Sequence, residues 1–236
     1  MTSLRASIVV PALNEEASIV TFLKRLEESV LLPVEVLVVV DTETDSTLVA
    51  LSDYSATRLE IRGLVSELPK GPANAIRYGI NSSKSDVVVI TMADGSDDPR
   101  AIDDLIRLVE RGCAVAAASR YMAGGQQIGG PRFKKLLSRN ASRALWLFLG
   151  VGTHDSTNSF KAYSKEFISE VGIESDKGFE VGLELVAKAH RSGRMIAEVP
   201  TIWIDRAIGE SNFQLRRWLP QYLRWFFYAF GPKLTK

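Results

Sequence analysis

Short runs of apolar, β-branched residues alternate with stretches of helical spacing along the first half of the chain. The apolar runs predict five strands, at residues 6–12, 34–41, 56–61, 86–91 and 113–119. The stretches between them predict four helices, at residues 15–30, 45–55, 71–83 and 98–112. Because the strands are apolar throughout, we expect an α/β fold in which helices cover both faces of a mostly parallel sheet.

Polar residues follow three of these strands where each one ends. They are Asn14, Asp41 and Asp94. The carboxyl ends of parallel strands meet at one edge of a sheet, and ligands bind beyond that edge. Asn14 also stands where it could cap the helix predicted to begin at residue 15. The three residues are therefore expected to line one site.

The second half of the chain is less regular. Residues 123–132 hold four glycines and a proline, which predicts a mobile loop that could fold over a substrate. Helices are expected at about 133–149, 164–171 and 178–192, followed by a strand at 195–204. Pro220 suits the first turn of a further helix of about eleven residues, since proline is tolerated there.

Composition narrows the class of protein. The chain has 236 residues, 46% apolar and 24% charged, and its net charge of +1 gives no overall attraction to nucleic acid. The single cysteine, Cys113, excludes an intramolecular disulfide and a cysteine-based zinc cluster. An early acidic pair argues against a signal peptide, and no run of about 18 to 20 apolar residues occurs. We expect a cytoplasmic protein.

Three aspartates crowd together after the fourth predicted strand, in "VVVITMADGSDDPR". Asp94, Asp97 and Asp98 fall within five positions. Like charges that close repel one another unless a metal or a cationic group lies among them. Taken alone, Asp97 and Asp98 could also be favourable charges at a helix N-terminus. The cluster raises the question of which cation it faces.

Six segments resemble glycosyltransferase family 2, and within it the dolichyl- or polyprenyl-phosphate mannosyltransferase-like enzymes. They are "PALNEE", "VVVDTETDST", "MADGSDDP", "ASRYMAGG", "DSTNSFKAYS" and "EVPTIWIDRAIGESNF", and the resemblance spans roughly residues 6 to 213. Each of the first three segments alone could be a helix cap, a turn or a charged helix N-terminus. Together and in this order, they imply a GT-A fold, a single Rossmann-like α/β/α domain expected to occupy residues 1–213.

The resemblance also implies which residues bind the donor, a nucleotide diphosphate sugar. Near the nucleoside or the diphosphate we expect Pro11, Ala12, Asn14, Glu15, Asp41, Met92, Ala93 and Asp94, and near the sugar Glu180. The family usually carries a DxD pair that binds a divalent cation, Mg²⁺ or Mn²⁺. Here Met92 replaces the first aspartate, and a thioether is a poor ligand for a hard cation.

Asp94 keeps the second carboxylate and is the expected metal ligand. Ser96 or Asp97 could assist through water, and Arg206 could replace part of the lost metal charge on the donor phosphates. The substitution at position 92 leaves the strength of metal binding in doubt.

Basic residues in and near the glycine-rich loop fit a phosphate acceptor. A phosphate monoester is mostly ionised near neutral pH, its second pKa being about 6, so it needs cations rather than a catalytic base. The residues expected to bind it are Arg120, Arg132, Lys134, Ser138 and Arg139. The alternative is that these cations form a solvated basic helix face.

The last segment, residues 214–236, is basic and aromatic. Seven of the twenty aromatic residues lie between Trp218 and Phe230, and five cations but no acid follow Glu210. A helix of about 16 Å would be too short to cross a bilayer but could lie at its interface. The alternative is a helix that packs its aromatic side chains into the core.

These expectations combine into one function. The chain is expected to be an inverting glycosyltransferase that moves mannose or glucose from a nucleotide sugar to a polyprenyl phosphate, peripherally bound at the cytoplasmic membrane face. Its catalytic residues would be Asp94, Arg120 and Arg206. Two alternatives stay open: transfer to a saccharide or protein hydroxyl, and a non-catalytic nucleotide-sugar-binding partner. The nucleotide base, the lipid length, and association with a membrane protein or a second copy also stay open.

Overall fold

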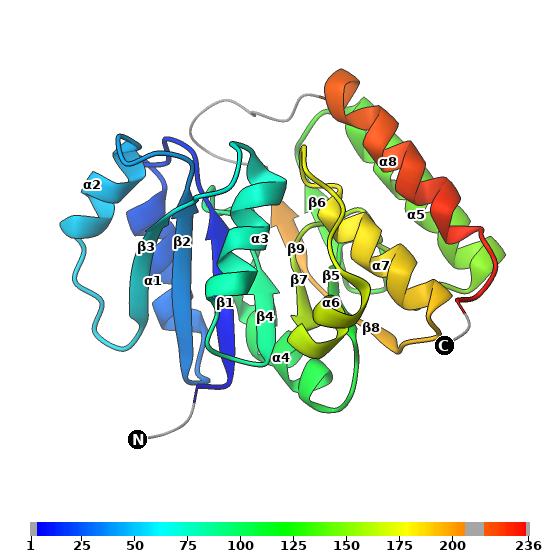
Figure 1. Cartoon of the computed structure of the whole chain (residues 1–236), viewed down its shortest axis with the longest axis horizontal. Helices are drawn as coiled ribbons and strands as arrows, with labels where there is room; N and C mark the ends of the chain where they lie inside the picture. Colours follow the sequence, from blue (N-terminus) through cyan, green and yellow to red (C-terminus); the bar gives the residue numbers. More distant parts are fainter. Residues whose placement is uncertain (1–3, 206–214, 235–236) are drawn as a thin grey trace.

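Seven strands form the central sheet of the computed structural model, which describes residues 4–205 and 215–234 (Figure 1). The strands are β1 (Ala6–Pro11), β2 (Val34–Val40), β3 (Glu60–Val65), β4 (Val87–Ile90), β5 (Val115–Ser119), β7 (Lys161–Ser164) and β8 (Ile196–Pro200). Their order is β3-β2-β1-β4-β7-β5-β8. β7 is antiparallel to β4 and β5, and the other pairs are parallel.

Helices cover both faces of this sheet, as the sequence predicts. One face packs against α1 (Ile19–Ser29), α2 (Ser46–Ser52) and α4 (Ile102–Glu110), the last preceded by a 3₁₀ turn, η1 (Pro99–Ala101). The other face packs against α3 (Pro72–Ser82), α6 (Lys165–Val171), α7 (Val181–Arg191), and parts of α5 (Arg132–Leu149) and α8 (Leu215–Ala229). Alternate strand residues supply the two cores: Ile8 and Val10 face one and Val9 the other.

The predicted strands differ from the observed ones in four places. The strand expected at 195–204 divides at Thr201, and its second part, β9 (Ile202–Ile204), leaves the central sheet. It pairs with β6 (Gln126–Ile128), which lies inside the segment predicted to be only a loop. The strand expected at 56–61 begins later, at Glu60. The four-residue strand β7 was not predicted, because it is short and runs directly into α6.

Helix starts differ from the sequence-based expectation in two places. Asn14 does not cap α1, which begins at Ile19; its backbone has a left-handed φ of 54° and its N–H donates to Asp45. Pro220 lies inside α8 and not in its first turn. Proline removes one backbone hydrogen bond there, so packing must stabilise the helix.

α8 packs on the rest of the domain. It contacts α7 and α5, and Trp225 is only 1% exposed in the core that also holds Tyr163 and Val186. Phe227, in contrast, is 66% exposed. The aromatic segment therefore divides between the core and the surface. Within residues 4–205 and 215–234, no helix combines the length and apolar character needed to span a bilayer.

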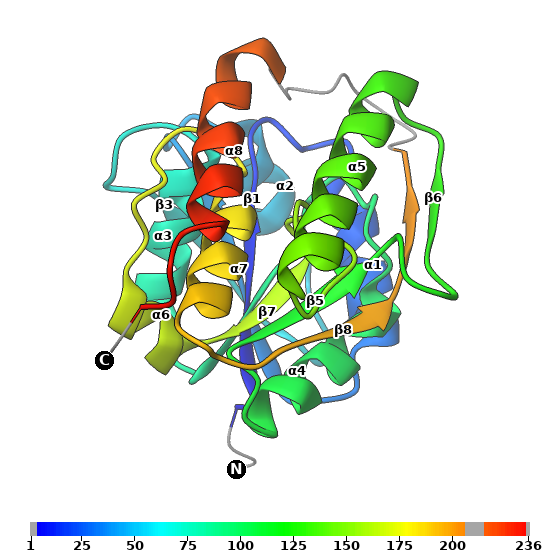
Figure 2. The same ribbon diagram turned by 90° about the vertical axis from the view of Figure 1, so that its right-hand side faces the viewer.

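Antiparallel β7 brings a loop to the edge of the sheet where the parallel strands end. β1, β2, β4 and β5 run toward this edge, and β7 starts from it. Residues 155–160, which precede β7, therefore lie beside the loops that follow the parallel strands. α5 and α8 lie side by side next to this edge (Figures 1 and 2).

Candidate functional site

A cleft of about 1060 Å³ lies beyond the carboxyl ends of the strands. We call its two sides the loop wall and the helix wall. The loop wall is formed by the end of β1 and by residues that follow β1, β2 and β3: Pro11, Ala12, Leu13, Asn14, Glu15, Asp41, Thr42, Thr44, Asp45, Lys70, Gly71 and Pro72. The helix wall is formed by α5 and α8: Lys134, Lys135, Leu137, Ser138, Ala141, Trp218, Leu219, Tyr222, Leu223 and Phe226.

Hydrogen bonds to two aspartates connect the loops of the loop wall. Asp45 caps α2 by accepting from the N–H of Thr47 at 2.9 Å, and it also accepts from the N–H of Asn14 at 3.1 Å. Asp41 accepts from the N–H of Gly71 at 3.1 Å, which fixes the start of α3 beside the end of β2. The loops after β1, β2 and β3 are thereby held in one arrangement.

The loop after β4 carries the acidic cluster between the two walls. Gly95 has a left-handed φ of 69°, which glycine adopts without strain, and it turns the chain sharply after Asp94. Asp94 accepts from the N–H of Ser96 at 2.9 Å. Asp98 turns away to cap η1 and to pair with Arg100, so it leaves the cluster.

Asp97 lies in the cleft lining, yet it is buried. It accepts hydrogen bonds from the hydroxyl of Thr91 at 3.1 Å and the N–H of Met92 at 3.3 Å. Burial, and next the charge of Asp94, raise the pKa of Asp97 to about 7, against the effect of these two hydrogen bonds. Asp97 is therefore partly protonated near neutral pH and adds less than a full negative charge to the end of β4.

The side chain of Met92 packs against the apolar core on the α7 and α8 side of the sheet. Among the described residues, no group of three or more His, Cys, Asp or Glu side chains could hold a metal ion. One carboxylate, Asp94, nevertheless fits a cation bound jointly with a substrate, because Mg²⁺ is often held by one or two carboxylates plus phosphate oxygens.

Arg120 reaches the cleft from the end of β5 and forms a buried, two-pronged ion pair with Asp155. Its Nε donates to Asp155 at 2.7 Å, its Nη2 donates to the other carboxylate oxygen at 2.9 Å, and its backbone N–H also donates to Asp155. Burial acts to lower the pKa of Arg120, but the charge and hydrogen bonds of Asp155 outweigh it and raise the pKa. Arg120 is therefore a fixed cation at the cleft floor.

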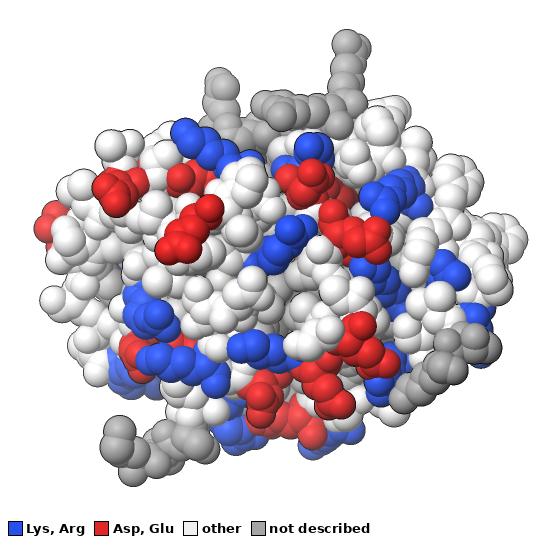
Figure 3. All heavy atoms as spheres, viewed as in Figure 1, with Lys and Arg blue, Asp and Glu red and all other residues white. Residues whose placement is uncertain are grey.

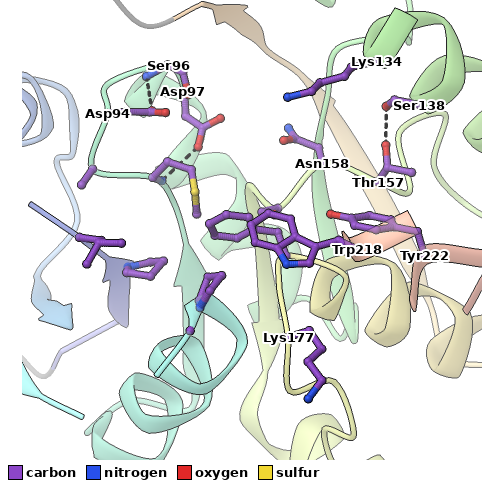
Figure 4. Close-up of a pocket in the computed structure, with 18 of the residues that line it drawn as sticks. Asp94, Ser96, Asp97, Lys134, Ser138, Thr157, Asn158, Lys177, Trp218 and Tyr222 are labelled. Carbon is purple, nitrogen blue, oxygen red and sulfur yellow. Dashed lines mark hydrogen bonds between the residues drawn. The ribbon is translucent and has the colours of Figure 1, made fainter. Parts of the chain in front are cut away.

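Hydroxyl groups surround Arg120 beside α5. Ser138 accepts from Nη2 of Arg120 at 3.3 Å, lies 2.5 Å from the hydroxyl of Thr157, and accepts from Tyr121 at 3.1 Å. Figure 4 shows Lys134 and Asn158 on this side of the cleft, facing Asp94 and Asp97. Basic and neutral hydrogen-bonding groups thus lie opposite the acidic loop.

A fully buried lysine, Lys161, supports this side of the cleft from beneath. Its ammonium group donates to the carbonyls of Ser156, at 3.2 Å, and Asn158. Burial lowers its pKa to about 7, against the opposing effect of Asp155. Lys161 therefore fixes the backbone of the loop whose side chains Thr157 and Asn158 line the cleft.

The cleft continues as an apolar passage along the helix wall. Leu137 and Ala141 of α5 line one side of it, and Leu219, Leu223 and Phe226 of α8 line the other. Leu223, one of these residues, is 43% exposed.

The structure brings most of the predicted site residues together. Those that line the cleft are Pro11, Ala12, Asn14, Glu15, Asp41, Met92, Ala93, Asp94, Arg120, Lys134 and Ser138. Glu180 is not part of the lining, although Phe179 beside it is: it is buried and accepts from the N–H groups of Lys177 and Gly178. Arg132 and Arg139 are exposed and are not part of the lining. Arg206 lies outside the described residues.

Sequence reasoning did not single out several residues that shape the cleft. They are Tyr121, Asp155, Thr157, Asn158, Lys161, Trp218 and Tyr222. A signal was present in "DSTNSFKAYS", where a cluster of polar residues precedes a lysine within an otherwise apolar strand. A lysine in that position requires buried hydrogen-bond acceptors, and the preceding backbone provides them.

Comparison with known proteins agrees with the resemblance noted in the sequence. The model of the family "Glycosyl transferase family 2" matches residues 7–172. The chain is 28% identical to a polyprenol monophosphomannose synthase of Mycolicibacterium smegmatis, covering 88% of this chain and 80% of that protein. It is also 28% identical to an undecaprenyl-phosphate mannosyltransferase of Micrococcus luteus, over 89% of this chain and 87% of that protein.

A third relative is longer than this chain. The dolichol-phosphate mannosyltransferase of Pyrococcus furiosus is 27% identical over 94% of this chain, but the match spans 64% of that protein. Among solved structures, glucosyl-3-phosphoglycerate synthase of Mycobacterium tuberculosis superposes with a TM-score of 0.68 at 23% identity, over 98% of this chain and 81% of that one. Such neighbours are GT-A glycosyltransferases, so the predicted GT-A fold is confirmed.

Proposed function

The chain belongs to glycosyl transferase family 2 and is a glycosyltransferase, and we propose that it transfers a hexosyl group from a nucleotide diphosphate sugar to a polyprenyl phosphate. The observation that carries this proposal is the cleft itself. Its basic, hydroxyl-rich side around Arg120 and Ser138 leads directly into an apolar passage between α5 and α8. A phosphate joined to a hydrocarbon chain is the class of acceptor that matches both features.

The donor would occupy the side formed by the loop wall and the acidic loop. The nucleoside would lie against residues 11–15 and 41–45, and the diphosphate would extend toward Asp94. A divalent cation bound by Asp94 and the diphosphate would supply charge neutralisation for the leaving nucleotide. The solved structural neighbours include complexes with Mn²⁺ and UDP, which supports this placement of a cation and a nucleotide.

The acceptor side needs to hold an anion and does not need to remove a proton. A lipid phosphate is largely ionised near neutral pH, and its oxygen can attack without a general base. Hydrogen bonds to Asp155 and Ser138 hold the guanidinium group of Arg120 in one orientation, so the cation is in place before the acceptor binds. Lys134 lines the same side of the cleft. In this reaction Arg120 would hold and orient the phosphate toward the sugar.

The names of the relatives favour a mannosyl group and a polyprenyl chain. Three of them are named for polyprenol, dolichol or undecaprenyl phosphate and for mannose transfer. Because the identities are only 27–28%, a glucosyl donor belongs in the same test. With a lipid substrate of this kind, the enzyme would work as a peripheral protein on the cytoplasmic face of a membrane.

One observation favours a second candidate, transfer to a hydroxyl. A hydroxyl acceptor must lose a proton, and a carboxylate with a pKa near 7 is well suited to accept it. Asp97 lines the cleft and its pKa is raised to about 7. This reaction predicts that Asp97→Asn abolishes transfer, whereas transfer to a phosphate would survive the substitution.

A donor screen followed by product analysis tests the proposal. Nucleotide sugars with guanine and uracil bases are first screened for thermal stabilisation, with and without Mg²⁺ or Mn²⁺, because a bound ligand stabilises the folded state. The stabilising donor is then incubated with a short-chain prenyl phosphate and the products are identified by mass spectrometry. The expected product is a prenyl phosphate sugar. Stabilisation without any product would favour a non-catalytic binding protein.

A further inference from the structure

Arg25 of α1 reaches the acidic loop from outside the cleft. Its side chain is half-buried, and its Nη1 donates to the carbonyl of Gly95 at 2.7 Å. A Cβ atom built at Gly95 would lie 3.2 Å from the same nitrogen, so the guanidinium group packs directly against the turn. Gly95 follows Asp94, the expected ligand of the donor's cation. Arg25 therefore contacts the backbone that sets the position of Asp94.

The turn of residues 94–96 is held by two separate elements of the fold. Besides Arg25, Ile204 of β9 donates its backbone N–H to the carbonyl of Ser96 at 3.0 Å. Within the turn, the N–H of Ser96 donates to the carboxylate of Asp94, as Figure 4 shows. Two consecutive carbonyls of the turn thus accept from α1 and from β9, while its carboxylate belongs to the cleft lining.

Arg25 does not belong to the described residues that line the cleft. It lines a separate hollow of about 290 Å³, together with Asp98, Arg100 and Ile204. Ser96 is the one described residue that lines both spaces, so the turn forms the partition between them. Because this partition separates Arg25 from the cleft, any effect of Arg25 on a bound donor has to pass through the turn.

The hydrogen bond from Arg25 differs from the charge pairs on the surface. Across most of the face in Figure 3, acidic and basic side chains lie next to one another. Exposed ion pairs contribute little, because water and salt screen them. The acceptor for Arg25 is a backbone carbonyl, to which a charged donor makes a stronger hydrogen bond than a neutral one. Phe22 and Leu26 anchor α1 in the core, so this donor stands on a rigid element.

The positive charge of Arg25 also lies behind the loop that carries the three aspartates. Burial acts to raise the pKa of Asp98, but Arg100 and, to a smaller extent, the charge of Arg25 lower it. Arg25 is thus close enough to offset part of the repulsion within the cluster. The acidic cluster therefore faces a cation of the protein itself on its outer side.

We propose that Arg25 is a positioning residue for the donor site: it holds the turn of residues 94–96 in the conformation in which Asp94 meets the cation and diphosphate of the donor. The inference rests on the proposed function, which places the diphosphate at Asp94. Without the hydrogen bond from Arg25, the turn adopts other conformations for part of the time. The apparent affinity for a donor that needs the native turn then falls in proportion to the fraction of molecules that keep it.

Nucleotide binding by the full chain tests the inference. The affinities of GDP and UDP are measured by calorimetry, with Mn²⁺ and with EDTA, for the unchanged chain and for Arg25→Met. The loss of a hydrogen bond from a charged donor should weaken binding with Mn²⁺ about tenfold. Binding with EDTA should not change, because hydrogen bonds to Asp41 and Asp45 hold the nucleoside side of the cleft. The KM for a short-chain prenyl phosphate should also stay the same.

Two further variants separate the hydrogen bond from the charge. Arg25→Lys keeps a charged donor at this position and should lose less affinity than Arg25→Met; it also carries the comparison if Arg25→Met fails to fold in thermal unfolding. The matched control, Arg100→Met, removes an arginine from the same hollow, but one whose ion pair is with Asp98. It should bind both nucleotides as the unchanged chain does.

Hydrogen exchange in the absence of any ligand reports on the turn directly. The N–H of Ser96 is protected by its hydrogen bond to Asp94, so exchange in residues 92–98 measures how often the turn opens. Exchange in this segment should be about tenfold faster in Arg25→Met than in the unchanged chain. In Arg100→Met it should be unchanged.

The outcomes separate the role of Arg25 from the proposed function. If exchange in residues 92–98 is the same in Arg25→Met as in the unchanged chain, Arg25 does not hold the turn and the inference is wrong. It is also wrong if the affinities fall equally with Mn²⁺ and with EDTA, since Arg25 would then act on the fold as a whole. If the unchanged chain binds neither nucleotide, the inference and the proposed function both fail. If binding and exchange behave as expected but no prenyl phosphate is glycosylated, only the proposed function fails.

Discussion

Replacing Asp97 with asparagine should make the protein more stable at neutral and alkaline pH. The carboxyl group is buried, and one of its oxygens accepts from both Thr91 and Met92. The amide oxygen of asparagine can accept the same two hydrogen bonds, while the side chain no longer carries a charge. The substitution therefore isolates the electrostatic contribution of this buried carboxylate.

The raised pKa fixes both the sign and the size of the effect. With a pKa of about 7 in the folded state and 3.8 as the ordinary value, the folded protein keeps a proton that the unfolded chain has lost. Stability therefore falls as pH rises from about 4 to about 7, by roughly 1.4 kcal/mol per pH unit, and then levels off. Between pH 5 and pH 8, Asp97→Asn should gain about 3 kcal/mol relative to the unchanged chain.

Urea denaturation at pH 5 and pH 8 measures this difference. Asp98→Asn is the control, because Arg100 lowers the pKa of Asp98 even though burial raises it. Its carboxylate stabilises the fold above its unfolded pKa, so Asp98→Asn should destabilise the protein at both pH values. If the stability of Asp97→Asn relative to the unchanged chain is the same at pH 5 and pH 8, the carboxyl does not have a raised pKa. Transfer to a phosphate acceptor should be retained.

Four further predictions concern the cleft and the core. Asp94→Asn should lower the rate of transfer by at least about 100-fold without unfolding the protein. Met92→Asp should restore a hard oxygen ligand and tighten the metal dependence of transfer. Identical metal titrations of Met92→Asp and the unchanged chain would exclude residue 92 from the cation site. Lys161→Met should raise the KM for the prenyl phosphate roughly tenfold, because buried hydrogen bonds are lost, and should leave the affinity for the nucleotide unchanged. If kinetic and binding assays show that the affinities for the prenyl phosphate and the nucleotide fall equally, Lys161 has only a structural role. Trp225→Ala should lower the free energy of unfolding, measured by urea denaturation, by about 3 to 5 kcal/mol, because Trp225 is only 1% exposed. A loss below about 1 kcal/mol would show that α8 is not part of the core.

Most of the fold could be predicted because local pattern and global packing agree. The parallel strands are apolar on both faces, and their alternating residues enter two separate cores. The same logic placed Asn14, Asp41 and Asp94 at one edge of the sheet, where they line the cleft. Strand β7 was missed because its four residues give too short a pattern to distinguish it from the helix that follows.

The acceptor side could not be predicted residue by residue from the same information. Helical spacing shows that cations cluster on α5, but it does not show which face of α5 meets the cleft. The structure turns Lys134 and Ser138 inward and leaves Arg132 and Arg139 exposed. Similarly, Glu180 resembles a sugar ligand in sequence, but backbone N–H groups of its own loop occupy its carboxylate.

The most direct test of the account compares two acceptors that differ only in the phosphate. The enzyme, its stabilising nucleotide sugar and Mg²⁺ are incubated with a short-chain prenyl phosphate or with the corresponding prenyl alcohol, and the glycosylated lipid is measured. The account predicts product from the phosphate and none from the alcohol, because the cleft supplies the fixed cation Arg120 and the reaction needs no base. Product from the alcohol at a comparable rate, or product that disappears in Asp97→Asn, would contradict it.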